Sequence, residues 1–307
     1  MSAYYLTRFS YYLSILLGII LFSFTLFHII PSDPARIILG ANANPQQVEQ
    51  LRERLGLDRP YHVQFVRYLQ DIVKLDFGNS YVDNRNVFQE VLRRLRITLT
   101  LTGIAVILIL IYLSTVVLSL VIPGMRRIQD LLEFFMSSLP VFFSGIIVAL
   151  FTIYFYPVTS FSGNLQSWSN ILYLMPPALV LSFYPIAILS KILKDEMASI
   201  LQSSYITAER AYGFSYIDIL YRYALKNSLL PVLSAFSNIL PVLLTGAFIV
   251  EIIFTIPGIG TLLIKSILER DFPMLECTVI VNGTFFVIVN LGFEYLYPAV
   301  DRRIIRG

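Results

Sequence analysis

Residues 97–122 read ITLTLTGIAVILILIYLSTVVLSLVI and contain no charged side chain. An α-helix of this length crosses the hydrocarbon core of a bilayer, which needs about 20 apolar residues. Five further apolar segments of similar length lie at 9–30, 131–156, 172–193, 229–254 and 274–297. The sequence therefore predicts an all-α, polytopic membrane protein with six transmembrane helices.

The composition of the whole chain excludes several other classes of protein. Hydrophobic residues make up 56% of the 307 positions and charged residues only 14%, against about 25% charged in soluble domains. Lys and Arg outnumber Asp and Glu by only 23 to 20, which is too small an excess for a nucleic-acid-binding surface. One cysteine, Cys277, and two histidines leave no disulfide framework or Cys-based zinc site. We therefore expect no metal and no cofactor.

Basic residues in the short connections predict the orientation, because cytoplasmic loops carry an excess of Lys and Arg. With the amino terminus inside, only Lys265 and Arg270 fall in short outer loops. The long segment between the first two helices has no influence on this choice, because long segments translocate largely regardless of charge. We therefore expect both termini in the cytoplasm. The basic residues on the inner side are then Arg8, Arg126, Arg127, Lys191, Lys194, Arg210, Arg222, Lys226, Arg302, Arg303 and Arg306.

The outer segment 31–96 is expected to form a helical insert. Asn44-Pro45-Gln46-Gln47 combines an N-cap residue with proline at the first helical position, and Gly56 suits the end of that helix. Pro60 precedes a second amphipathic stretch. The insert is either a cap packed on the helical bundle or a docking surface for a soluble partner. The residues expected on the apolar face of the second helix are Val66, Leu69 and Val73.

The inner loop 191–228 predicts a helix, a glycine turn and a second helix between the fourth and fifth membrane spans. Helical periodicity runs through 198–212, and Gly213 interrupts it. Ser215 and Asp218 match a capping box that starts a short helix ending at Leu225. Two interpretations stay open: a stiff element gripped by another protein, or an amphipathic pair lying among lipid headgroups.

Motifs for nucleotide hydrolysis and for other common catalytic sites are missing from the sequence. It contains no G-x-x-x-x-G-K-[ST], no H-E-x-x-H and no G-x-S-x-G. We therefore expect that the protein is not an enzyme and that any ATPase is another chain. Glu251, Glu276 and Glu294 lie near the ends of predicted spans, which argues against the proton pathway that intramembrane acids otherwise indicate.

Short motifs follow one another along most of the chain, in an order and spacing that identify a family. The chain resembles the inner-membrane permease subunits of bacterial peptide/nickel-type ABC importers, of the first-permease type. The matching stretches are PSDP 31–34, LGLDRP 55–60, LDFGNS 75–80, SLPVFF 138–143, AERAYG 208–213, YALKNSLLPV 223–232, PGIG 257–260, RDFP 270–273 and DRR 301–303.

The resemblance implies the permease subunit of an ATP-driven importer for peptides or related small solutes, including metal chelates. Such a subunit forms half of the translocation pathway in the bacterial inner membrane. The implied partners are a second, paralogous permease, one or two cytoplasmic ABC ATPases, an extracytoplasmic substrate-binding protein and the lipid bilayer, without nucleic acid. The implied domains are 1–30, the insert 31–96, the permease core 97–297 with its coupling loop 191–228, and the tail 298–307.

The resemblance also implies roles for individual residues. Positions 208, 209 and 212 depart from the family's T-A-R-A-K-G pattern at the ATPase-contact segment. The coupling residues implied are Ala208, Glu209, Arg210, Ala211, Gly213, Ser215 and Asp218. The outer loop or gate residues implied are Glu251, Pro257, Gly258, Gly260 and Asp271.

Two other functions remain open on the residues alone. One is a secondary carrier that uses the membrane acids, and the other is a scaffold whose inner loop docks a signalling protein. The identity of the cargo does not follow from the sequence.

Overall fold

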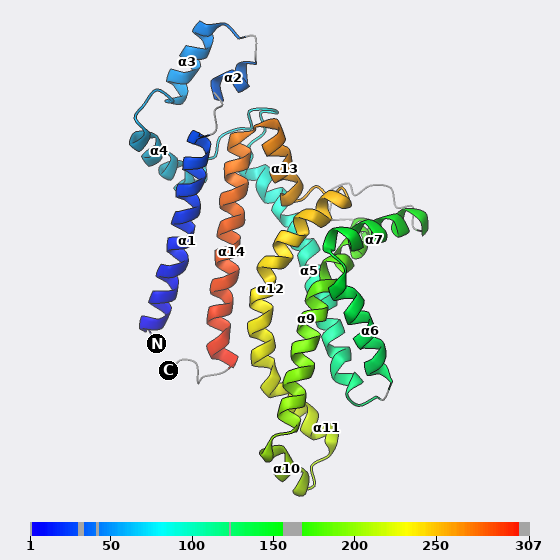
Figure 1. Cartoon of the computed structure of the whole chain (residues 1–307). Helices are drawn as coiled ribbons and strands as arrows, with labels where there is room; N and C mark the ends of the chain where they lie inside the picture. The colour runs from blue at the N-terminus through cyan, green and yellow to red at the C-terminus, as the bar shows by residue number, and fades with distance from the viewer. Residues whose placement is uncertain (1, 30–33, 41–42, 123, 156–167, 301–307) are drawn as a thin grey trace. The chain divides into compact units, whose positions relative to one another are not determined.

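The structure is a computed structural model that describes residues 2–29, 34–40, 43–122, 124–155 and 168–300. The motif residues 31–33, the end of the third predicted span at residue 156 and the basic tail from residue 301 lie outside these ranges. The helices are α1 Ser2–Ile29, α2 Pro34–Leu39, α3 Pro45–Leu55, α4 Tyr61–Val73, α5 Val87–Ser119, α6 Met125–Ser138, α7 Val141–Phe155, α8 Trp168–Tyr173, α9 Met175–Leu201, α10 Ser204–Ala211, α11 Tyr216–Asp218, η1 Ile219–Leu225, α12 Lys226–Ile253, α13 Ile259–Glu269 and α14 Phe272–Val300 (Figure 1).

Long apolar helices confirm the predicted all-α membrane fold. Five helical runs of the described residues are long and apolar enough to cross a membrane, and a sixth crossing exists if the bent pair α6–α7 counts as one span. The five runs are Leu6–Thr25, Val87–Ser119, Ile171–Leu201, Tyr216–Ile253 and Phe272–Leu296. Each of them overlaps one of the predicted segments.

The third predicted span, 131–156, is wrong as a continuous helix. α6 and α7 meet at 109° across a short break at Leu139 and Pro140. Proline lacks a backbone N–H and disfavours the helical conformation of the residue before it, and Leu139 is extended (φ −94°, ψ 124°). The apolar part that remains, α7, has only 15 residues, which is short for a crossing of about 30 Å at 1.5 Å per residue.

The fourth predicted span, in contrast, is continuous in spite of its prolines. Pro176 and Pro177 occupy the first turn of α9, where backbone N–H groups have no partner within the helix. Pro185 lies inside α9 and is buried, a position that membrane helices tolerate when neighbours pack around it.

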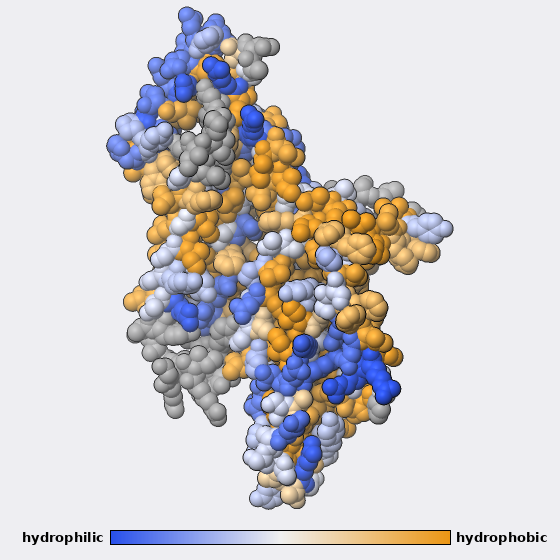
Figure 2. Space-filling view, viewed as in Figure 1, coloured by the Kyte–Doolittle hydropathy of each residue, from blue (hydrophilic) through white to orange (hydrophobic). Residues whose placement is uncertain are grey.

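The chain divides into two compact units: Met1–Arg96 with Gly258–Leu291, and Ile97–Pro257 with Gly292–Gly307. In the second unit α9 is the central helix, and α6, α7 and α12 pack against it. Its core is apolar and includes Leu101, Ile109, Leu189 and Leu243. Leu150, Phe151 and Ile153 of α7 face outward, and Figure 2 shows hydrophobic residues over this helix, as a lipid-facing surface requires. The domain limits expected from the sequence stay a prediction.

In the first unit the predicted helices of the insert are present, but the predicted face of α4 is wrong. Asn44 caps α3 by accepting the Gln46 N–H at 3.1 Å, and Gly56 ends α3 in the left-handed conformation (φ 72°). On α4, Val66 and Val73 are exposed. The half-buried face instead contains Phe65, Tyr68, Leu69 and Ile72, and Phe65 and Tyr68 contact Phe24 of α1. Their i, i+3, i+4, i+7 spacing was readable in the sequence.

A buried cation joins α9 to α6 in the second unit. The Lys194 Nζ lies 2.7 Å from Asp130 Oδ1 and 2.8 Å from Glu133 Oε2, and only 7% of the lysine side chain is exposed. Tyr112 of α5 donates a further, longer hydrogen bond to Glu133, at 3.4 Å. These contacts hold three helices together at a point where sequence patterns show only scattered charges.

Replacing Lys194 tests this cluster. We expect Lys194→Met to lower the free energy of unfolding by about 3–5 kcal/mol, because it leaves the buried Glu133 carboxylate without its cation. The measurement is denaturant unfolding of the purified protein in detergent. Lys191→Met, an exposed lysine on the same helix, is the matched control, and equal stability of the two variants would contradict the role of the cluster.

Candidate functional site

The segment between α9 and α12 forms a sharp elbow in the second unit. α10 ends at Ala211, and Gly213 follows with φ +88°. Phe214 N–H donates to the Glu209 carbonyl at 3.3 Å, and Gly213 N–H donates to the Arg210 carbonyl at 3.0 Å. This left-handed C-terminal turn is typical of glycine, because other residues are strained there. The predicted glycine turn is therefore present.

Ser215 starts the next helix, as predicted. Its Oγ accepts the Asp218 N–H at 3.1 Å and donates to Asp218 Oδ2 at 2.6 Å. The described hydrogen bonds thus differ from a full capping box, because the acid accepts from the serine hydroxyl and not from the serine backbone. Arg222 lies 3.5 Å from Asp218 Oδ1 on the following turn.

The expected second short helix does not end at Leu225. The helical run continues from Tyr216 to Ile253 without a break, with a π-helical segment at Ile219–Leu225. No glycine or proline stands between Gly213 and Pro231, which was the signal for a continuous helix. π-Helical segments are rare and often lie at functional sites. The elbow therefore continues into α12 without a break.

The elbow has a small apolar core of its own. Ile206, Ile219, Leu220 and Ala224 are completely buried, and η1 packs against α9, α10 and α12. The predicted coupling residues lie on the outside: Ala208, Arg210, Ala211, Gly213 and Ser215 are exposed, and Glu209 and Asp218 are partly buried.

Exposed aromatic residues flank the predicted coupling residues. Tyr212 is 83% exposed, and Phe214, Tyr216 and Tyr221 are exposed as well. Large aromatic side chains of this kind are enriched at protein–protein interfaces.

The predicted outer-gate residues fall into different units. Glu251 and Pro257 belong to the second unit, and Gly258, Gly260 and Asp271 belong to the first. Glu251 is completely buried in the last turn of α12, and its Oε1 accepts a hydrogen bond from Thr98 Oγ1 of α5 at 2.5 Å. Gly258 precedes the first turn of α13, and Gly260 is buried within that turn.

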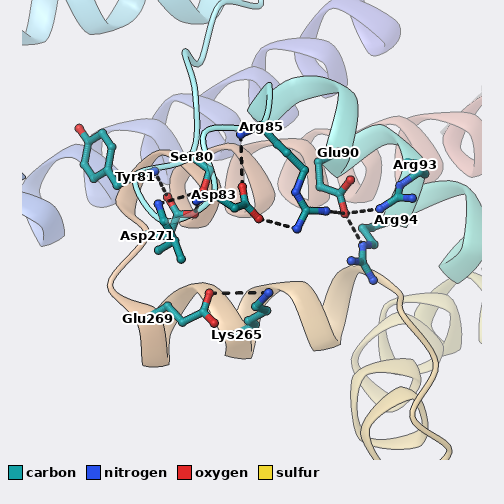
Figure 3. A network of polar contacts seen from close by, with 11 residues as sticks. Ser80, Tyr81, Asp83, Arg85, Glu90, Arg93, Arg94, Lys265, Glu269 and Asp271 are labelled. Carbon is teal, nitrogen blue, oxygen red and sulfur yellow. Dashed lines mark hydrogen bonds and ion pairs between the residues drawn. The ribbon is translucent and has the colours of Figure 1, made fainter. Parts of the chain in front are cut away.

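In the first unit Asp271 anchors a loop of the insert. This carboxylate, in a residue only 4% exposed, accepts Ser80 Oγ–H at 2.5 Å and Tyr81 N–H at 3.1 Å (Figure 3). The loop closes on itself through an antiparallel bridge between Asn79 and Asn86. The two partners of this contact are separated by about 190 positions in sequence, so only the fold reveals it.

Charged residues continue from this loop into α5. Glu90 accepts hydrogen bonds from Arg93 at 2.8 Å and from Arg94 at 2.7 Å (Figure 3). Arg85 pairs with Asp83 at 2.5 Å. Partial burial works to raise the pKa of Asp83, but hydrogen bonds from Arg85 and Ser80 outweigh it and hold this pKa below its usual value. The Asp83 carboxylate therefore stays ionised, and the loop keeps its ion pair, down to acidic pH.

Comparison with known proteins identifies the family. Residues 125–306 match the family described as "Binding-protein-dependent transport system inner membrane component", and residues 1–102 match its N-terminal companion. The chain belongs to this family. This confirms the resemblance seen in the motifs, and it makes the protein a multi-pass inner-membrane permease of an ABC transport system.

Several relatives are similar to the chain over nearly their full length. The chain is 31% identical to the dipeptide transport system permease protein DppB of Alkalihalophilus pseudofirmus and 31% identical to the oligopeptide transport system permease protein AppB of Bacillus subtilis. It is 29% identical to the glutathione transport system permease protein GsiC of Salmonella paratyphi A. In each case 99% of both chains is covered.

The anchor at Asp271 can be tested directly. We expect Asp271→Asn to raise hydrogen–deuterium exchange of residues 79–86 at least tenfold, because losing one charge-assisted hydrogen bond costs about 1.5–3 kcal/mol. Glu269→Gln is the matched control, since its pair with Lys265 is exposed at 3.8 Å and such pairs contribute less than about 1 kcal/mol. Unchanged exchange in Asp271→Asn would show that the carboxylate does not hold the loop.

Proposed function

We propose that this permease is one half of the membrane pathway of an ATP-driven peptide importer, driven through the elbow at Ala208–Asp218. The observation that carries the proposal is the unbroken helix from Tyr216 to Ile253. A push on the elbow is transmitted to α12, because the elbow's apolar core and the capped turn connect the two without a break. Pro231 and Pro241 lie further along α12. The names of the relatives DppB and AppB support peptides as the cargo.

The packing of α12 extends this movement to the rest of the second unit. α12 packs along α9 and α7, and η1 packs on α9 as well. Packed helices shift as rigid bodies between discrete arrangements. A displacement at the elbow therefore tilts the helices around the core and alternates the opening of the pathway.

The partners in the proposal follow from the family and from the surfaces. One or two cytoplasmic ABC ATPases bind the exposed aromatic and basic face of the elbow. A second, paralogous permease supplies the other half of the pathway, and an extracytoplasmic binding protein delivers peptide to the outer face. The distribution of Lys and Arg supports cytoplasmic termini and a cytoplasmic elbow.

Substitutions at Gly213 test the coupling role. We expect Gly213→Val to abolish peptide uptake while the complex still reaches the membrane, because a β-branched residue is strained at φ +88° by at least about 1–2 kcal/mol. A clash is not the cause, since no atom lies within 4 Å of a β-carbon at this position. Gly213→Asn is the matched control and should retain uptake, because asparagine tolerates left-handed backbone. Wild-type uptake by an assembled Gly213→Val complex would contradict the proposal.

The buried Glu251 bears on one competing function, that of a carrier driven by a proton gradient, because such a carrier needs an acid within the membrane. Its contact with Thr98 favours a structural role, because the hydroxyl supplies the hydrogen bond that a buried carboxylate requires. We expect uptake by Glu251→Gln to retain its ATP dependence and to be insensitive to an uncoupler that leaves ATP levels intact. Wild-type uptake that collapses with the gradient alone would favour the carrier.

A further inference from the structure

A cavity of about 710 Å³ lies within the first unit, and the loop that Asp271 anchors forms part of its wall. Its wall comes from α1, α3, α4, the loop after α4 and the start of α14. Sites for small molecules have volumes of about 300–1,000 Å³, so the cavity has room for a ligand of that size.

Charged groups of both signs line the cavity. Among the described residues, no hydrogen bond or ion pair reaches the side chains of Arg67, Asp71 or Glu276, all of which line it. Arg67 and Asp71 stand one turn apart on α4, and Glu276 lies in the first turns of α14. Glu276 is partly buried, and a carboxylate removed from water without a cation is costly. A ligand that brings a cation to the acids and an anion to the arginine would complement this arrangement.

Two tyrosines add neutral hydrogen-bonding groups beside Glu276. Burial, followed by the charge of Glu276, raises the pKa of Tyr68. Burial, followed by the charges of Glu276 and Asp271, raises the pKa of Tyr81 to about 12. Both hydroxyls therefore stay protonated. The Tyr68 Oη is buried beside the hydroxyl of Ser23, whereas the Tyr81 backbone N–H donates to Asp271 (Figure 3).

The apolar part of the wall restricts the ligand further. Phe24, Val63, Ile72 and Phe77 line the same cavity as the charged groups. Apolar walls with a few polar groups that fix orientation are typical of small-molecule sites. A ligand with an ammonium group, a carboxylate and apolar side chains satisfies every part of this wall.

We propose that the cavity binds a short peptide with free termini, its amino group at Glu276 and Asp71 and its carboxylate at Arg67. The cavity is then a waiting site for cargo on the insert of the permease itself, separate from the binding protein. This inference rests on the proposed function, because it takes the imported peptide as the ligand.

Calorimetric titration of the purified full-length permease in nanodiscs, without any partner, tests the site. The probes are trialanine, N-acetyl-trialanine and trialanine amide. We expect saturable binding of trialanine, and at least tenfold weaker binding of each blocked peptide, because each one loses a charge-assisted contact. No binding of trialanine at millimolar concentration, or equal binding of all three peptides, overturns the proposal.

Variants assign the two ends of the peptide. Glu276→Gln should weaken the binding of trialanine at least tenfold and reduce the difference in affinity between trialanine and N-acetyl-trialanine. Arg67→Gln should weaken the binding of trialanine by the same factor and reduce the difference in affinity between trialanine and trialanine amide. Glu53→Gln and Arg54→Gln are the matched controls, because both residues are exposed on α3 and outside the cavity wall. Arg67 is exposed, so its variant tests the site even if Glu276→Gln does not assemble. A third outcome is that the permease binds no trialanine and that these variants no longer capture the purified binding protein. The cavity would then be a docking surface for that protein, which would overturn the peptide site.

Uptake by the complete importer separates this inference from the proposed function. Absent trialanine binding together with intact ATP-dependent peptide uptake overturns the cavity site alone. Intact trialanine binding in an importer that transports no peptide supports the site and overturns the proposed function.

Discussion

The hydrocarbon core of a membrane contains no water, so every segment that crosses it must satisfy its own backbone N–H and C=O groups. This constraint explains why the described residues are helical almost throughout and why irregular backbone is confined to a few places. They include the bend at Leu139–Pro140, the turn at Gly213, the stretch before Gly258 and the loop at 75–86. Each break lies at the end of a helix, where other groups can supply the missing hydrogen bonds.

The same absence of water governs the charged residues. Lys194 lies between two carboxylates, Asp271 accepts two hydrogen bonds from the insert, and Glu251 accepts one from Thr98. These buried groups join segments far apart in sequence, because each needs a partner that its own helix does not provide. Glu276 departs from this rule, since it faces a cavity and meets no partner among the described residues. Its partner in our proposal is the amino group of a peptide.

The elbow and the cavity serve different steps of transport in this account. The elbow is stiff because it has a buried core, a capped start and no break before α12, and stiffness is what the transmission of force requires. The cavity instead leaves charges unsatisfied, which is what the capture of a charged ligand requires. Each unit of the permease thus carries one of these two properties, so each can be tested without the other.

The residues alone indicated much of the fold, because apolar length and local capping act within one segment. Residues 97–122 predicted a membrane helix, Asn44 and Gly56 predicted the ends of α3, and Gly213 and Ser215 predicted the turn of the elbow. Contacts between distant segments could not be read in this way. The bend at Pro140, the buried face of α4, the partners of Lys194 and the anchor of Ser80 on Asp271 all depend on which surfaces meet after folding. Helix formation follows from hydrogen bonds between residues four apart in the sequence. Burial and ion pairing instead depend on which residues are neighbours in space, and only the tertiary structure decides that.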